Sequence, residues 1–243
     1  MLLLFSVLYC PLLLCHLALP SRSAVPLSPT IAGKGTFASR MAPIFKIPTI
    51  STGDLIRAEI KAGSDIGKEV KSITDKGGLA SDEIVLSLLK KRLDQPDAQA
   101  GFILDGYPRR ISQADTLATI HPISLAVNLV LDQDILVEKA LARRICENCG
   151  TGYNLANIQR DGYMMPPLLP KHEGKCDKCC GNLITRADDT ESIIRDRLSV
   201  YFKETFPIIE YYRERGLLME FKVKKGVADL PDLVSEIESK LKK

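Results

Sequence analysis

Short apolar runs alternate with amphipathic segments along most of the chain. Apolar runs over 101–105, 127–131 and 217–221 predict buried strands of a parallel sheet. Apolar residues three and four positions apart predict helices between these runs, which begin near Ser51 or Thr52, near Ser64, near Ser81, at Asp134 and at Asp188, with a closing helix over 230–241. This succession indicates an α/β fold, a parallel sheet flanked by helices.

The periodic pattern breaks between residues 146 and 185, where Gly, Pro, Cys and Asn are frequent. We expect an inserted module there, after a helix over 134–145 and before the long helix that Asp188 opens. The whole chain has 243 residues, of which 45% are apolar and 26% charged, which suits one large domain with inserts. A net charge of +3 is too small to indicate binding to nucleic acid or to an anionic membrane.

The N-terminus is apolar, and no charged residue precedes Arg22. Residues 1–27 are interpreted as a targeting segment or a mis-assigned first exon, with an ordinary buried helix as the alternative. A signal peptide would lack its basic n-region, and Pro11 and His16 weaken a membrane anchor. We expect membrane contact only through transient targeting by this segment, and an organelle interior (plastid or mitochondrion) or the cytoplasm rather than secretion.

Five of the seven cysteines fall within 35 residues, which favours a metal site in a reducing compartment over a disulfide scaffold. Two C-x₂-C pairs, Cys146 with Cys149 and Cys176 with Cys179, offer four thiolates for a tetrahedral Zn²⁺ site. A fully ligated ion of this kind is structural. Redox dithiols or plain buried thiols are the alternatives, and Cys180 is either a spare thiol or a substitute for Cys179.

A glycine-rich turn before a helix can direct backbone N–H groups at phosphates while a lysine reaches the terminal ones. The chain has such a turn at Gly33, Lys34, Gly35 and Thr36. The pattern is incomplete, because Ser28 stands where an opening glycine is expected and Pro26 interrupts the segment where a central strand should run. A surface turn is the alternative interpretation.

The apolar run at 101–105 ends in Asp105, a position from which a carboxylate can hold the water shell of Mg²⁺. Gly106 lets the backbone pass close to a ligand, and Arg109 can grip phosphate with two hydrogen bonds. Tyr107 and Pro108 complete this turn, with Pro108 stiffening it. The alternative is a tight turn that carries a solvated arginine.

Phosphoryl transfer needs several cations and little acid–base help, because negative charge spreads over three oxygens in its transition state. Candidate cations lie at the predicted ends or inward faces of elements, at Arg57, Arg109, Arg143, Arg186 and Arg197. The three histidines are scattered and are interpreted as structural or exposed.

Five segments together resemble the adenylate kinase family in its long, zinc-binding lid form, with plastid and bacterial members most similar. They are GKGT (33–36), STGDLIR (51–57), GFILDGYPRR (101–110), ARRICENCG (142–150) and LITRADDTESIIRDRL (183–198). The resemblance runs from about Gly33 to the C-terminus. It implies the P-loop nucleoside monophosphate kinase fold over residues 28–243, with an AMP-binding insert at 51–80 and a zinc-binding lid at 143–189.

The resemblance also implies roles for single residues. ATP would be held by Gly33, Lys34, Gly35, Thr36 and Arg143. AMP would be held by Thr52, Arg57, Gly106, Tyr107, Pro108, Arg109, Gln113, Arg186 and Arg197. The catalytic set would be Lys34, Asp105, Arg109, Arg143, Arg186 and Arg197, with Mg²⁺ on the nucleotide and structural Zn²⁺ on Cys146, Cys149, Cys176 and Cys179.

The implied activity is the reversible transfer ATP + AMP to 2 ADP by a monomer that binds no nucleic acid. A GTP-dependent AMP kinase is one alternative. A catalytically inactive nucleotide-binding protein is the other, because the first strand and the front half of the phosphate loop look absent or replaced. Two further departures are Lys139, where many members have an arginine against the adenine, and the 26 residues between the cysteine pairs.

Overall fold

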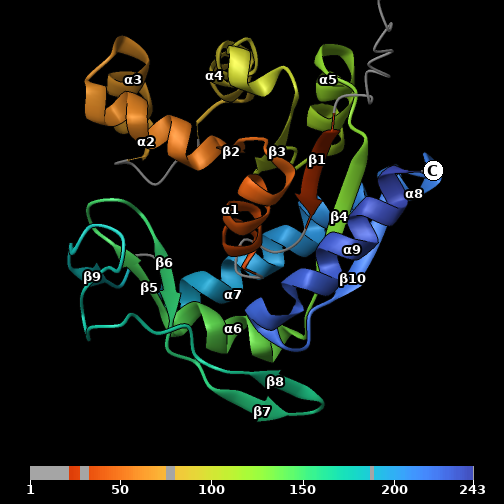
Figure 1. Cartoon of the computed structure of the whole chain (residues 1–243). Helices are drawn as coiled ribbons and strands as arrows, with labels where there is room; N and C mark the ends of the chain where they lie inside the picture. The colour runs from red at the N-terminus through yellow and green to blue at the C-terminus, as the bar shows by residue number, and fades with distance from the viewer. Residues whose placement is uncertain (1–21, 28–32, 75–79, 187–188, 243) are drawn as a thin grey trace, which may run out of the picture.

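A five-stranded parallel sheet forms the centre of the molecule in a computed structural model that describes residues 22–27, 33–74, 80–186 and 189–242 (Figure 1). The strand order is β10-β4-β1-β3-β2, and every pairing is parallel. The strands are β1 (Arg22–Leu27), β2 (Thr49–Ser51), β3 (Gly101–Asp105), β4 (Leu125–Val130) and β10 (Leu218–Lys222). The predicted α/β class is confirmed.

Helices cover both faces of the sheet because successive strand residues point to opposite sides. In β3, Phe102 and Leu104 enter one core cluster and Ile103 the other, so the whole run must be apolar. The cluster around Phe102 includes side chains of α4 (Asp82–Leu93), α5 (Ile111–Ile120) and α8 (Phe206–Glu214). The cluster around Ile103 includes side chains of α1 (Lys34–Phe45), α6 (Gln133–Leu141), α7 (Glu191–Val200) and α9 (Leu230–Leu241).

The first strand, which was expected to be absent or replaced, is present. Strand β1 lies between β3 and β4 in the middle of the sheet despite Pro26. Its register with β3 runs only from Arg22 to Ala24, and Pro26 is in register with β4 alone. Proline has no backbone N–H to donate. It is tolerated at position 26 because β1 is no longer paired with β3 there. The questioned segment 28–32 lies outside the described residues.

Serine side chains begin the predicted helices. Ser51 accepts from the N–H of Asp54 at 3.3 Å, and Ser81 accepts from the N–H of Ile84 at 3.4 Å. Each bond satisfies one N–H group that the first helical turn leaves without a partner. The expected stop of the second helix, at residues 77–78, lies outside the described residues. The two helices of the 51–80 segment are α2 (Thr52–Ala62) and α3 (Asp65–Thr74).

The helix predicted over 134–145 ends earlier, at Leu141, because residues 143–146 form a strand. That strand, β5 (Arg143–Cys146), pairs antiparallel with β6 (Gly152–Asn154) and β9 (Leu183–Ile184). The long helix expected after Asp188 is present as α7, then a π-helical turn η2 (Tyr201–Thr205), then α8. Short 3₁₀ turns lie at Pro96–Ala98 and Gly226–Asp229.

A hairpin in the inserted module packs into the main core. It consists of β7 (Ile158–Arg160) and β8 (Tyr163–Met165), and Figure 1 shows it below α6. Ile158, Tyr163 and Met165 are almost fully buried in the cluster that contains Ile103. The hydroxyl of Tyr163 accepts from the N–H of Asp132 at 3.2 Å. The hairpin is therefore held to the core, whereas the β5-β6-β9 sheet has a small cluster of its own.

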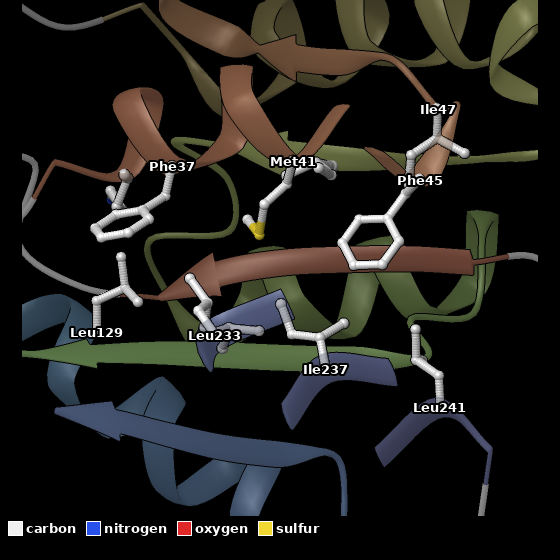
Figure 2. A pocket seen from close by; sticks show the side chains of 11 residues that line it. Phe37, Met41, Phe45, Ile47, Leu129, Leu233, Ile237 and Leu241 are labelled. Atoms are coloured by element: carbon white, nitrogen blue, oxygen red, sulfur yellow. The ribbon is translucent and has the colours of Figure 1, made fainter. Parts of the chain in front are cut away.

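An apolar cavity of about 20 Å³ lies between α1, the sheet and α9. Figure 2 shows Phe37, Met41 and Phe45 of α1 pointing toward Leu233 and neighbouring side chains of α9. A water molecule needs polar partners, and this lining offers almost none. Among the residues that the structure describes, no helix combines the length and apolar character needed to cross a membrane.

The position of β1 predicts different outcomes for two truncations. A chain that begins at Ser21 should keep a cooperative thermal transition, because it retains every strand of the described sheet. A chain that begins at Ser28 should lose it, because β3 and β4 would face an empty central position. Circular dichroism against temperature measures both. A cooperative transition in the shorter chain would contradict this placement of β1.

Candidate active site

Lys34 and Asp105 meet at the carboxyl edge of the sheet. Lys34 begins α1 directly after Gly33, whose φ of 79° is in the left-handed region that favours glycine. Asp105 ends β3. The Lys34 Nζ lies 3.9 Å from a carboxylate oxygen of Asp105, and the two side chains are 9% and 19% exposed. A Cβ on Gly35 would lie 3.4 Å from the same carboxylate, so the turn runs close to it.

Burial makes the charge on Lys34 costly. Desolvation lowers the pKa of Lys34 to about 8, the Asp105 carboxylate opposes this shift, and the Arg109 guanidinium adds to it. Lys34 also lines the apolar cavity between α1, the sheet and α9, where it has no water to solvate its charge. An anion that approached from the open side would restore the ordinary pKa.

The turn after β3 requires glycine at position 106. Gly106 has φ 88°, and a Cβ there would lie 2.9 Å from the Thr52 hydroxyl oxygen. The Arg109 Nε donates to the Gly106 carbonyl at 2.9 Å. Thr52, Gly106 and Arg109 are therefore in close contact. Tyr107 and Pro108 are buried beneath them, joined by a cis peptide bond, and burial raises the pKa of Tyr107 to about 12.

Arg109 connects this turn to α7. Desolvation lowers the pKa of Arg109, the Arg197 guanidinium lowers it further, and Asp105 opposes both. Arg109 is nevertheless exposed to solvent as a residue. Lys34, Asp105, Arg109 and Arg197 thus form one electrostatic cluster, contributed by α1, β3, the following turn and α7. Such a cluster of cations around one carboxylate has an affinity for anions.

Gln113 holds the turn from the next helix. The backbone N–H of Arg109 donates to Gln113 Oε1 at 2.7 Å. Gln113 Nε2 in turn donates to Asp82 Oδ1 at 2.7 Å, and Arg110 pairs with the same carboxylate at 2.9 Å. Asp82 belongs to the first turn of α4, 31 residues away. The sequence pattern indicated only that a helix begins near Ser81, and it gave no sign that Asp82 reaches this turn.

Arg143 is already paired with a buried carboxylate. Its Nε donates to Asp189 at 2.8 Å and its terminal nitrogen makes a second bond to the same group. The Asp189 side chain is 0% exposed and that of Arg143 is 17% exposed. Arg186 lies beside them, since its carbonyl accepts from the N–H of Asp189 at 3.1 Å. Asp189 lies 46 residues from Arg143, and the sequence pattern indicated only that a helix begins beside it, at Asp188.

Arg57 lies apart from these groups. It is exposed on α2 and pairs with Asp54 of the same helix turn. A Cβ on Gly53 would lie 3.2 Å from its guanidinium, so Arg57 folds back along α2. Thr36 is in the first turn of α1, and its carbonyl accepts from Ser39 and Arg40. The described contacts of Arg57 and of Thr36 thus stay within their own helices, α2 and α1.

The four predicted metal ligands converge. The sulfurs of Cys146, Cys149, Cys176 and Cys179 all lie within 4.8 Å of one another. Cys146 and Cys179 are 3.4 Å apart, and Cys149 and Cys176 are 3.6 Å apart. Zn–S bonds of about 2.3 Å in a tetrahedron put sulfurs about 3.8 Å from one another, so the cluster has the right size for zinc.

The two cysteine pairs share one backbone conformation. The N–H of Gly150 donates to the Cys146 carbonyl at 3.0 Å, and the N–H of Cys180 donates to the Cys176 carbonyl at 2.9 Å. Both donors are left-handed, with φ 70° at Gly150 and 58° at Cys180. Cys180 therefore takes the place that glycine takes in the first pair, and it is not one of the four clustered ligands.

Comparison with known proteins agrees with this geometry. The family model described as adenylate kinase matches residues 27–217. The chain is 43% identical over 205 residues to "Adenylate kinase 1, chloroplastic" of Arabidopsis thaliana. The match covers 81% of this chain and 70% of that protein. It is 40% identical over 222 residues to an adenylate kinase of Archaeoglobus fulgidus, with 89% and 96% covered. An adenylate kinase of Thermodesulfovibrio yellowstonii is 43% identical over 217 residues, with 87% and 95% covered.

The chain belongs to the adenylate kinase family. It is a phosphotransferase with the P-loop nucleoside monophosphate kinase fold, as the resemblance implied. In this fold ligands bind outside the carboxyl ends of the strands, which is where Lys34 and Asp105 meet.

The buried charge predicts that Lys34→Met stabilises the protein. A folded-state pKa of about 8 against an ordinary 10.5 means that the folded chain binds this proton less tightly than the unfolded chain. Below pH 8 the buried ammonium then lowers the free energy of unfolding by about 1–3 kcal/mol, and the variant should gain that amount. The penalty fades as the pH rises toward 10.5, so the gain should fade as well. Urea unfolding between pH 7 and 10 measures it, and a less stable variant at pH 7 would contradict the assignment.

Proposed function

We propose that this site carries the adenylate kinase reaction, reversible phosphoryl transfer from ATP to AMP to give two ADP. The observation that carries the proposal is the cluster of Lys34, Arg109 and Arg197 around Asp105. Lys34 and Arg197 each repel Arg109, Asp105 offsets only part of the cost, and a phosphate group between these cations would offset more of it. Negative charge grows on the transferring group, so cations fixed in advance lower the barrier.

The roles follow from where each cation lies. Lys34, with Gly33, Gly35 and Thr36 around it, would hold the terminal phosphates of ATP. Arg109 and Arg197 would hold the AMP phosphate and the transferring group, with Thr52 and the Gly106 turn against the AMP. Arg186 and Arg143 would approach from the inserted module. The partial desolvation of Lys34 and Arg109 strengthens their attraction for phosphate, because neither is fully screened by water.

Mg²⁺ fits the group at the end of β3. Asp105 is one-fifth exposed and lies 3.9 Å from Lys34, a loose contact that leaves carboxylate lone pairs for metal-bound water. When bound, the ion would neutralise part of the negative charge on the phosphates. Asp105 would orient the waters of that ion, while Lys34 holds the phosphates beside it.

The two inserts would close over the nucleotides. In Figure 1, the α2–α3 pair of the AMP-binding segment at 51–80 and the β5-β6-β9 sheet extend from the same side of the core. For the lid at 143–189, we infer that only the cysteine-bearing part moves. The β7–β8 hairpin is buried in the main core and would stay with it. Closure would exclude water, which protects the phosphoryl group from hydrolysis.

Zinc would support the moving part of the lid. The four thiols meet at the size of a tetrahedral site, and the Tyr153 hydroxyl donates to Cys176 at 3.6 Å. The local apolar cluster contains only Cys146, Tyr153 and Cys176, with Leu183 against it. A core this small cannot stabilise a separate unit, so a bound metal would supply much of its folding energy.

Adenine nucleotides are the expected substrates on both sides. The relatives are named adenylate kinases, which does not favour GTP as donor or an inactive protein. Lys139 of α6 would lie against the ATP adenine, and burial lowers the pKa of Lys139 while Glu138 opposes that shift. We further propose a monomer that binds no nucleic acid. An organelle interior is the proposed location, since two of the relatives are named chloroplastic proteins of Arabidopsis.

Arg197→Lys should reduce turnover strongly. Lysine cannot reproduce the two-pronged grip of a guanidinium, so kcat should fall by about 10²–10³. A coupled assay of ADP formation from Mg-ATP and AMP, with purified zinc-loaded protein and with GTP as a second donor, measures both activity and donor choice.

Arg195→Lys is the matched control for that experiment. Arg195 lies on the same helix, is 59% exposed and pairs with Glu191. Its replacement should change kcat less than about twofold, as expected for an exposed ion pair. Equal losses in the two variants would refute the role of Arg197, and no ADP formation by the unaltered chain would refute the function.

Two neighbouring cysteines provide a matched test of the zinc site. Cys179→Ser should lower bound zinc below one ion per chain and destabilise the lid, because it removes one of four ligands. Cys180→Ser should keep one ion, since its sulfur lies outside the cluster. Elemental analysis of protein purified without chelator gives the stoichiometry. Loss of zinc from the Cys180 variant alone would reverse the assignment.

A further inference from the structure

Two partners of opposite type hold the side-chain amide of Gln113. The backbone N–H of Arg109 can only donate, so the atom 2.7 Å from it must be Oε1. The Asp82 carboxylate can only accept, so the atom 2.7 Å from it must be Nε2. An amide turned by 180° would place nitrogen against N–H and oxygen against carboxylate. Both contacts therefore select the same orientation.

This buried amide keeps hydrogen-bonding capacity for a ligand. Gln113 is only 7% exposed. Oε1 has two lone pairs and Nε2 has two hydrogens, and each described partner uses one of them. Among the described residues, no contact takes the remaining lone pair or the remaining hydrogen. An acceptor and a donor thus lie side by side next to Arg109, ready for a group that presents the complementary pair.

Purine bases differ in this pair. Adenine presents a donor at its 6-amino group and an acceptor at N1. Guanine and hypoxanthine present an acceptor at O6 and a donor at N1. An amide that rotated freely could match either base. In its fixed orientation the amide matches adenine. Against a 6-oxopurine the same orientation would place donor against donor and acceptor against acceptor.

We propose that Asp82 is a positioning residue that fixes the Gln113 amide and thereby makes the acceptor site select adenine over 6-oxopurine bases. The proposal rests on the proposed function, in which Arg109 holds the AMP phosphate, and on the AMP-binding role that the family resemblance implies for Gln113. Asp82 touches no nucleotide in this role. It acts through Gln113, from the first turn of α4 and 31 residues earlier in the chain.

Asp82 has two other interactions whose effects can be tested separately from this positioning role. Its negative charge stabilises the N-terminus of α4, and Glu83 in the same turn provides the same charge. Its carboxylate also pairs with Arg110 at 2.9 Å. Glu83→Gln and Arg110→Met are therefore matched controls, because the first removes a charge from the helix terminus and the second removes the ion pair.

The test compares AMP and IMP as phosphoryl acceptors. IMP differs from AMP at the two positions that the amide would read and lacks the 2-amino group of GMP. Asp82→Asn can donate as well as accept, so one of the two constraints on the amide is lost. The ratio of kcat/KM for AMP to that for IMP should fall by at least about tenfold in this variant, while kcat for AMP changes little. Glu83→Gln and Arg110→Met should leave the ratio within about twofold.

A double-mutant cycle shows whether Asp82 acts through Gln113. In a Gln113→Met background, Asp82→Asn should no longer change the ratio. An unchanged ratio in both Asp82→Asn and Asp82→Ala, with AMP turnover retained, would overturn the proposal. So would an undiminished effect in the Gln113→Met background. Absence of any AMP turnover by the unaltered chain would instead refute the proposed function, and calorimetric affinities for AMP and IMP would still test the selection of the base.

Discussion

The candidate site is organised by one electrostatic constraint, the repulsion of Arg109 by Lys34 and by Arg197 at the carboxyl edge of the sheet. Asp105 offsets part of this repulsion, but it lies 3.9 Å from Lys34 and does not restore the ordinary pKa of that side chain. The buried charge of Lys34 lowers the stability of the fold. The packing of α1 on the sheet and on α9 holds the lysine in place and offsets this cost. A phosphate brought between the cations would relieve the repulsion, and binding energy is then available where the chemistry occurs.

Much of the fold and part of this site could be predicted from the sequence because the informative residues are neighbours in the chain. The turn at 33–36, and the strand and turn at 101–109, each place backbone and side chain through local geometry. The partnerships of Asp82 with Gln113 and of Asp189 with Arg143 could not be predicted in that way. Their members are 31 and 46 residues apart, and an acid before a helix has the same local pattern whether or not a distant cation claims it.

The errors at strand β1 and at the end of α6 have different physical causes. Pro26 counts against a central strand only where a neighbouring strand needs an N–H at that position, and the ladder with β3 has already ended at Ala24. The segment after Leu141 was assigned to a helix because a short apolar pattern fits both helix and strand. What decides it is the pairing of residues 143–146 with β6 and β9. The sequence also did not predict that the β7–β8 hairpin is buried in the main core, since only tertiary packing distinguishes it from the rest of the insert.

Two of the candidate phosphate-binding arginines, Arg57 and Arg143, pair with carboxylates of the chain. The two ion pairs differ in strength. Arg57 pairs with Asp54 in the open, where an ion pair contributes about 0–1 kcal/mol, so its transfer to a ligand costs little. Arg143 pairs with a fully buried Asp189, and removing one partner of a buried pair leaves a charge that costs about 3–5 kcal/mol. If Arg143 turned to ATP without a replacement, Asp189 would be left with that cost. The two bonds use Nε and one terminal nitrogen of Arg143, so its other terminal nitrogen can still donate to a phosphate while the pair with Asp189 is kept. The buried pair therefore fixes the position of Arg143, whereas Arg57 is held only by an exposed ion pair.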